Sequence, residues 1–112
     1  MQLATFVFCT IIVKDSCNMT KIFFCGDIIN RFSDHGFIGQ KLESFIKDAD
    51  YAIGNFEGTL FYEGMEGVGM VQRPSTLAVL RNAGFDLLLL ANNHIGDYGK
   101  DGFTHTLREI DK

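Results

Sequence analysis

The sequence lacks the motifs that mark the common nucleotide-binding and nucleophile-based enzymes. Its 112 residues contain no G-x-x-x-x-G-K-[ST] loop, no G-x-G-x-x-G fingerprint and no G-x-S-x-G elbow. There are only three cysteines and no C-x-x-C pair, which excludes a zinc knuckle or a dithiol redox motif. Free thiols in a reducing compartment are the simplest interpretation, so we expect a cytoplasmic protein, with association to the cell envelope as an open alternative.

Basic residues and long apolar runs are also scarce. Ten Lys and Arg against fourteen Asp and Glu give a net charge of −4, so no basic stripe is available for nucleic acid. The longest apolar stretch, Leu3 to Val13, is too short to cross a bilayer, and we expect no transmembrane span. A hydrophobic content of 46% and a charged content of 21% are typical of a globular domain, or part of one.

Residues 1–18 are an extension of uncertain status. They lack the basic start and the small-residue cleavage site of a signal peptide. Because Met19 directly precedes the first clear strand, we hypothesise that Met19 is the initiator and that the domain proper covers residues 19–112. A weakly membrane-associating segment and an extra edge strand are the alternatives for residues 1–18.

The rest of the chain alternates between strand and helix patterns. Short apolar runs predict buried strands at 21–25, 51–54 and 86–90. Helical spacing of apolar residues predicts a helix between the first two strands, another that Ser75 caps and Gly84 ends, and a last one. This last helix carries Phe103, Leu107 and Ile110 at i, i+4 and i+7, and the Gly-rich stretch Gly58–Gly69 reads as a loop or hairpin. The pattern predicts an α/β fold, a mainly parallel sheet with flanking helices.

Polar side chains follow each predicted strand. Asp27 follows the first, Asn55 and Glu57 follow the second, and the last strand runs into a longer polar cluster. The members of that cluster are Asn92, Asn93, His94 and Asp97. Because ligands bind at the carboxyl ends of parallel strands, we expect these groups to converge on a metal ion or a phosphoryl group.

These motifs resemble the bacterial capsule-synthesis family, the CapA-type poly-gamma-glutamate biosynthesis proteins. The resemblance rests on three segments in order and runs from about Lys21 to the last residue: Gly26-Asp27, Asn55-Phe56-Glu57, and Ala91-Asn92-Asn93-His94-Ile95-Gly96-Asp97-Tyr98-Gly99 with Gly102 and Thr106 beyond. This family is a branch of the calcineurin-like metallophosphoesterases. The resemblance implies the first half of a four-layer α/β/β/α domain.

The resemblance also implies roles for the polar residues. Asn93 would be a metal ligand and His94 would contact the phosphoryl group, as the catalytic residue. The carboxylates Asp27 and Glu57, with Asn55, would hold divalent ions such as Mn, Zn or Fe. In many calcineurin-like enzymes a His stands two positions after the first Asp, but Ile29 stands there in this chain.

Three further residues are candidates for binding a small anionic or polymer-linked substrate. Asn92 and Asp97 lie in the same cluster as His94, and the Arg73 guanidinium suits a phosphate or carboxylate. Each has a plainer interpretation: Asn92 ties the loop backbone, Asp97 caps the last helix or orients His94, and Arg73 is a solvated surface residue. His35 and His105 are assigned no chemistry.

Two functions of different class follow. The first is a metal-dependent phosphoesterase-like protein of the capsule-synthesis type, incomplete because the family's later His motifs are not in this chain. The second is a non-catalytic accessory or binding fragment in capsular polymer synthesis. An unpaired sheet edge and the partly uncovered face of the last helix also predict self-association.

Overall fold

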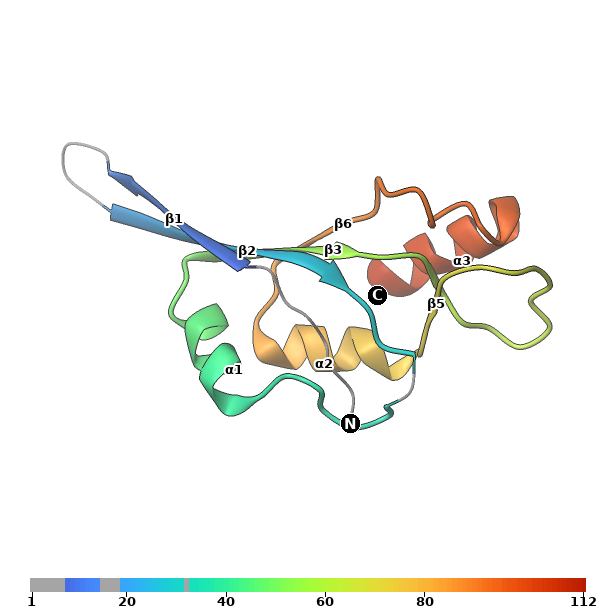
Figure 1. Cartoon of the computed structure of the whole chain (residues 1–112), viewed down its shortest axis with the longest axis horizontal. Helices are drawn as coiled ribbons and strands as arrows, with labels where there is room; N and C mark the ends of the chain where they lie inside the picture. Colours follow the sequence, from blue (N-terminus) through green and yellow to red (C-terminus); the bar gives the residue numbers. More distant parts are fainter. Residues whose placement is uncertain (1–7, 15–18, 32) are drawn as a thin grey trace.

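The computed structural model describes residues 8–14, 19–31 and 33–112, and within them it shows an α/β fold (Figure 1). One four-stranded sheet has the order β1-β2-β3-β6. Strands β2, β3 and β6 run parallel to one another and β1 runs antiparallel to β2, which confirms the prediction of a mainly parallel sheet. The strands of this sheet are β1 (Phe8–Lys14), β2 (Met19–Ile28), β3 (Tyr51–Phe56) and β6 (Leu87–Leu89).

Residues 8–14 form an edge strand. All seven residues of β1 pair with β2, from Phe8 opposite Cys25 to Lys14 opposite Met19. The extra edge strand considered for residues 1–18 is therefore present over this part, whereas residues 1–7 and 15–18 lie outside the described residues. The division of the chain at Met19 stays a prediction. None of the helices among the described residues is long and apolar enough to cross a membrane.

Helices α1 (Gln40–Lys47) and α2 (Ser75–Ala83) cover one face of the sheet (Figure 1). The core lies between them and β2 and β3, and its fully buried members include Phe23, Ile46, Phe56 and Leu80. Gly84 ends α2 with a φ of 100°, as predicted, because a residue with a Cβ is strained in this left-handed conformation.

The predicted capping role of Ser75 is wrong. Pro74 holds the N-cap position of α2, and no side chain caps the helix. Ser75 therefore lies already inside the first turn, and its hydroxyl donates to the carbonyl oxygen of Ser33 and to Asp34.

The Gly-rich stretch contains no helix, as expected, but it is not a hairpin. Strands β4 (Thr59–Leu60) and β5 (Val71–Gln72) pair in parallel as a separate small sheet. Gly58 makes this pairing possible, since it has a φ of +83° and its Cα lies against Met70.

Helix α3 (Gly99–Ile110) packs on β4 through its small residues. Gly102 and Thr106 are buried, and the Thr106 hydroxyl accepts a hydrogen bond from the Leu60 N–H at 3.0 Å. Phe103 and Leu107 stay exposed by 39% and 36%. The apolar face predicted for this helix thus has only part of its cover among the described residues.

The opposite face of the sheet carries apolar side chains that none of the helices in the described ranges covers. Register places Ile11, Ile22 and Tyr51 in one row across β1, β2 and β3. Leu87 and Leu89 of β6 extend this face and are half exposed. In the described part of the molecule, one face of the sheet is therefore covered by helices and the other face is open.

A β-bulge sets the direction of the last residues of β2. Cys25 pairs with Gly54 and Asp27 pairs with Asn55, so Gly26 is an extra residue between two consecutive pairs. Ile28 then pairs with Phe56, and both are completely buried. The bulge thus turns Ile28 into the core and leaves Asp27 exposed beside Asn55.

Candidate functional site

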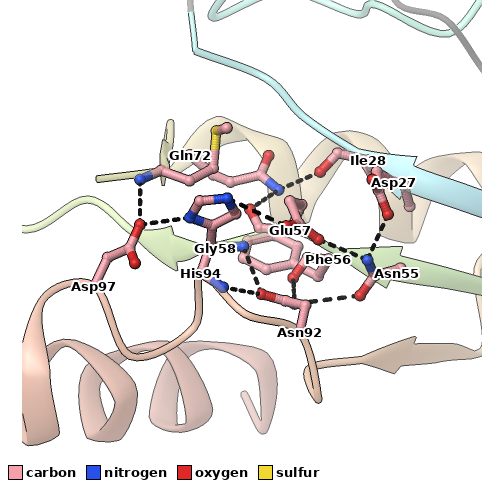
Figure 2. A network of polar contacts seen from close by, with 11 residues as sticks. Asp27, Ile28, Asn55, Phe56, Glu57, Gly58, Gln72, Asn92, His94 and Asp97 are labelled. Carbon is pink, nitrogen blue, oxygen red and sulfur yellow. Dashed lines mark hydrogen bonds and ion pairs between the residues drawn. The ribbon is translucent and has the colours of Figure 1, made fainter.

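A continuous network of polar side chains lies at the carboxyl ends of β2 and β3 and in the loop that follows β6 (Figure 2). It joins six of the predicted site residues, which come from three separate segments of the chain. They are Asp27, Asn55, Glu57, Asn92, His94 and Asp97. The expected convergence at the carboxyl edge of the sheet is therefore seen for these six.

Two carboxylates converge on one amide nitrogen. Asn55 Nδ2 donates to Asp27 Oδ1 at 2.6 Å and to Glu57 Oε2 at 2.7 Å. Asp27 is exposed, whereas Glu57 is only 6% exposed. A carboxylate that is nearly buried needs hydrogen bonds or a cation to offset its lost hydration, and Asn55 supplies part of this.

Asn92 connects the two loops of the site. Its Nδ2 donates to Asn55 Oδ1 at 3.2 Å and to the Phe56 carbonyl oxygen at 2.9 Å. Its Oδ1 accepts from the N–H groups of Gly58 at 3.3 Å and His94 at 3.1 Å. All four contacts are with protein groups, so Asn92 holds the loop backbone in place, as its plainer interpretation stated.

His94 is oriented by Asp97. The ring Nδ1 lies 2.8 Å from Asp97 Oδ2, and the same oxygen accepts from the Met70 N–H at 2.7 Å. The Met70 N–H first, and the His94 hydrogen bond second, lower the pKa of the Asp97 carboxyl below its usual range. The other ring nitrogen, Nε2, lies 4.0 Å from Glu57 Oε1. Of the roles left open for Asp97, orientation of His94 is the one that this geometry supports, since Tyr98 and not Asp97 holds the N-cap of α3.

Gln72 and Asn30 frame the site, although sequence reasoning did not select them. Gln72 is completely buried and donates from Nε2 to the carbonyl oxygens of Glu57, at 2.9 Å, and Ile28. Its Oε1 accepts from the Asn30 N–H at 2.9 Å. Gln72 thereby ties the ends of β2 and β3 to β5. The only signal was a polar residue directly after the apolar pair Met70-Val71, which is weak.

Asn93 and Arg73 are not part of this network. Asn93 is exposed, and within the described part of the chain its side chain makes no hydrogen bond to the other candidate residues. Arg73 forms an ion pair with Asp34 instead, in a separate pocket. Their predicted roles in metal and substrate binding stay predictions.

The donor set fits part of a divalent metal site. Asp27 and Glu57 reach one common point, and carboxylate oxygens are ligands that divalent ions prefer. In residues 8–14, 19–31 and 33–112, however, no three His, Cys, Asp or Glu side chains lie close enough together to hold an ion. Amide oxygens and further ligands would be needed to complete the shell.

Comparison with known proteins agrees with the motifs. The family described as "Bacterial capsule synthesis protein PGA_cap" matches residues 21–112. The "Capsule biosynthesis protein CapA" of Bacillus anthracis is 29% identical over 89 residues, which are 73% of this chain and 21% of that protein. The "PGA biosynthesis protein CapA" of Bacillus subtilis (strain 168) is 32% identical over 80 residues, or 67% of this chain and 21% of that protein. The chain thus spans about a fifth of the length of these curated relatives.

Proposed function

Because the chain belongs to the bacterial capsule synthesis protein family, we propose that it supplies the first part of a metal-dependent phosphoesterase-like site in a protein of capsule or poly-gamma-glutamate synthesis. The names of the relatives support a role in the synthesis of this polymer. The mixed α/β fold with its mostly parallel sheet is consistent with part of a calcineurin-like domain. Phosphoester hydrolysis is proposed for a protein of the relatives' full length, of which the matched part of this chain covers about a fifth.

The observation that carries this proposal is the convergence of Asp27 and Glu57 on the Asn55 amide, beside an oriented His94. Two carboxylates at one point favour a cation. A divalent ion held by Asp27, Glu57 and an amide oxygen would neutralise the charge that develops on a phosphoryl group. Since Asp97 engages Nδ1 of His94, Nε2 is the ring atom left to hold a proton and deliver it to a leaving oxygen.

Calorimetric titration of the chain with Mn²⁺ or Zn²⁺ tests the metal site. We expect measurable binding that Asp27→Asn and Glu57→Gln each weaken by about tenfold or more, since each removes one charged ligand. Glu63→Gln is the matched control, because Glu63 is exposed and lies in the Gly-rich loop outside the network. Equal affinity in all these variants would contradict the assignment of Asp27 and Glu57.

A non-catalytic binding role in polymer synthesis is the second candidate. The observation that favours it is the incomplete ligand set among the described residues. We expect the isolated chain to hydrolyse a generic phosphoester weakly or not at all, well below about 1 s⁻¹. Turnover at an enzyme-like rate would reject this second candidate, and a complete failure to bind metal would favour it.

A further inference from the structure

Two adjoining pockets lie along helix α2, apart from the carboxylate pair. The first has a volume of about 410 Å³, and the second about 420 Å³, both in the range of small-molecule sites. They share Phe61 and Pro74 in their walls. The first pocket extends from this shared wall to Arg73 and the second to Arg81, so together they can accommodate an extended ligand.

The pockets concentrate positive charge in a chain whose net charge is −4. Four of its ten Lys and Arg residues line them: Arg31, Arg73, Arg81 and Lys112. The acidic residues in the two linings are Asp34 and Glu109, and each already pairs with a lining cation. Such a cluster in an acidic protein favours an anionic ligand.

The first pocket already binds a carboxylate, that of Asp34. Arg73 Nε donates to Asp34 Oδ1 at 2.5 Å, and Nη2 donates to Oδ2. The Ser75 hydroxyl donates to the same Oδ1 at 3.3 Å. A guanidinium fork that engages both oxygens recognises the planar shape of a carboxylate as well as its charge.

The receiving groups are anchored, whereas Asp34 is not. The Arg73 N–H donates to the Asn30 carbonyl oxygen at 2.9 Å, and the neighbouring Gln72 is completely buried. The Asp34 side chain is 59% exposed and lies outside any helix or strand. An incoming carboxylate can therefore replace Asp34 without disturbing the core.

We propose that these pockets bind an acidic peptide-like chain that bears several carboxylates. Its first carboxylate takes the place of Asp34 on Arg73, and the following part crosses Phe61, which is 47% exposed, toward Arg81. Arg73 precedes α2 and Arg81 lies in its last turn. The two pockets together therefore span at least the ~9 Å that six helical residues cover from Ser75 to Arg81. This proposal needs no metal ion and does not depend on phosphoesterase activity.

The test is the fluorescence anisotropy of a labelled glutamate oligopeptide, measured without metal. Arg73→Gln and Arg73→Lys should each weaken binding by about tenfold, since Lys keeps the charge but loses the fork. Asp34→Asn should tighten binding several-fold, because the neutral amide competes less well than the Asp34 carboxylate for the Arg73 guanidinium. Lys21→Gln and Asp48→Asn are the matched controls, since they break an exposed Lys–Asp pair with no residue in either pocket and change the charge equally.

Three results would overturn the proposal. In the first, Arg73→Lys binds like the unchanged chain, so the fork is not used. In the second, Asp34→Asn and Asp48→Asn change affinity equally, so only net charge matters. In the third, a polyphosphate of the same charge binds as tightly as the glutamate oligopeptide. Far-UV circular dichroism of each variant shows whether it is folded, and all substituted residues are at the surface or partly exposed.

Discussion

At the scale of single residues, the neighbours Asn92 and Asn93 have opposite environments. Asn92 makes four hydrogen bonds to two segments, whereas Asn93 is exposed. We expect Asn92→Ala to lower the free energy of unfolding by about 2 to 3 kcal/mol, since it leaves partly buried donors and acceptors without partners. Asn93→Ala should change it by less than about 0.5 kcal/mol. Urea denaturation of both variants makes the comparison, and equal effects would contradict the role assigned to Asn92.

The Asp97 carboxyl makes the stability of the folded chain depend on pH in the acid range. Because its pKa is lower in the folded state, its stabilising contribution is complete above the usual aspartate value of about 4 and is lost as the pH falls through the lowered value. Unfolding measured in urea from pH 5 to about 2 should therefore show a smaller loss of stability in Asp97→Asn than in the unchanged chain. Asp111→Asn, at the exposed end of α3, serves as the control, and an unchanged pH profile in Asp97→Asn would contradict this account.

At the scale of elements, the close approach of Gly58 to Met70 controls the pairing of β4 with β5. Gly58 and Gly64 both have a φ of +83°, but an added Cβ at Gly64 meets nothing within 4 Å. At Gly58 it would meet the Met70 backbone oxygen, with Met70 Cγ at 2.7 Å. We expect Gly64→Ala to cost about 1 kcal/mol of unfolding free energy for backbone strain alone. Gly58→Ala should cost about 2 kcal/mol more for the clash, and similar thermal unfolding of the two variants would disprove this reading.

The main elements could be predicted because each has a local signal. Apolar runs marked β2, β3 and β6, and Gly84 marked the end of α2. The parallel pairing of β4 with β5 could not be foreseen, because it depends on two two-residue strands that are too short to show a strand pattern in the sequence. The burial of Gly102 and Thr106 on α3 was hidden for a similar reason, since the close contact with β4 selects small residues over the larger apolar ones.

The candidate site, too, could be predicted only in part from the sequence. The proximity of Asp27, Glu57 and His94 could be predicted from the order of their motifs, because parallel strands end at one edge of a sheet. The choice between Asn92 and Asn93 needed the direction of each side chain, which adjacent positions in a loop do not reveal. Gln72 has its partners 15 and 44 residues away, so its role depends on tertiary contacts alone.

At the scale of the whole molecule, the open face of the sheet predicts self-association. Ile11, Tyr51, Leu87 and Leu89 are exposed by 44 to 56%, depending on the residue, within a face that none of the described helices covers. We expect the weight-average mass in sedimentation equilibrium to rise with concentration, because association removes this apolar area from water. Leu87→Lys should reduce the effect. Val68→Lys, at a 93% exposed position in the Gly-rich loop, should not, and a monomer at every concentration would contradict the prediction.

The bulge at Gly26 accommodates one extra residue in β2. Cys25 and Asp27 are two residues apart, so in a strand of regular alternation both would face the core and Ile28 would face outward, whereas the bulge at Gly26 reverses the faces of Asp27 and Ile28. Removing Gly26 itself would place Asp27 directly after Cys25 and keep its pairing with Asn55, so this one deletion exchanges no carboxylate with a core side chain. Over evolutionary time, the bulge therefore gives β2 one residue that can be lost without changing which side chains reach the core.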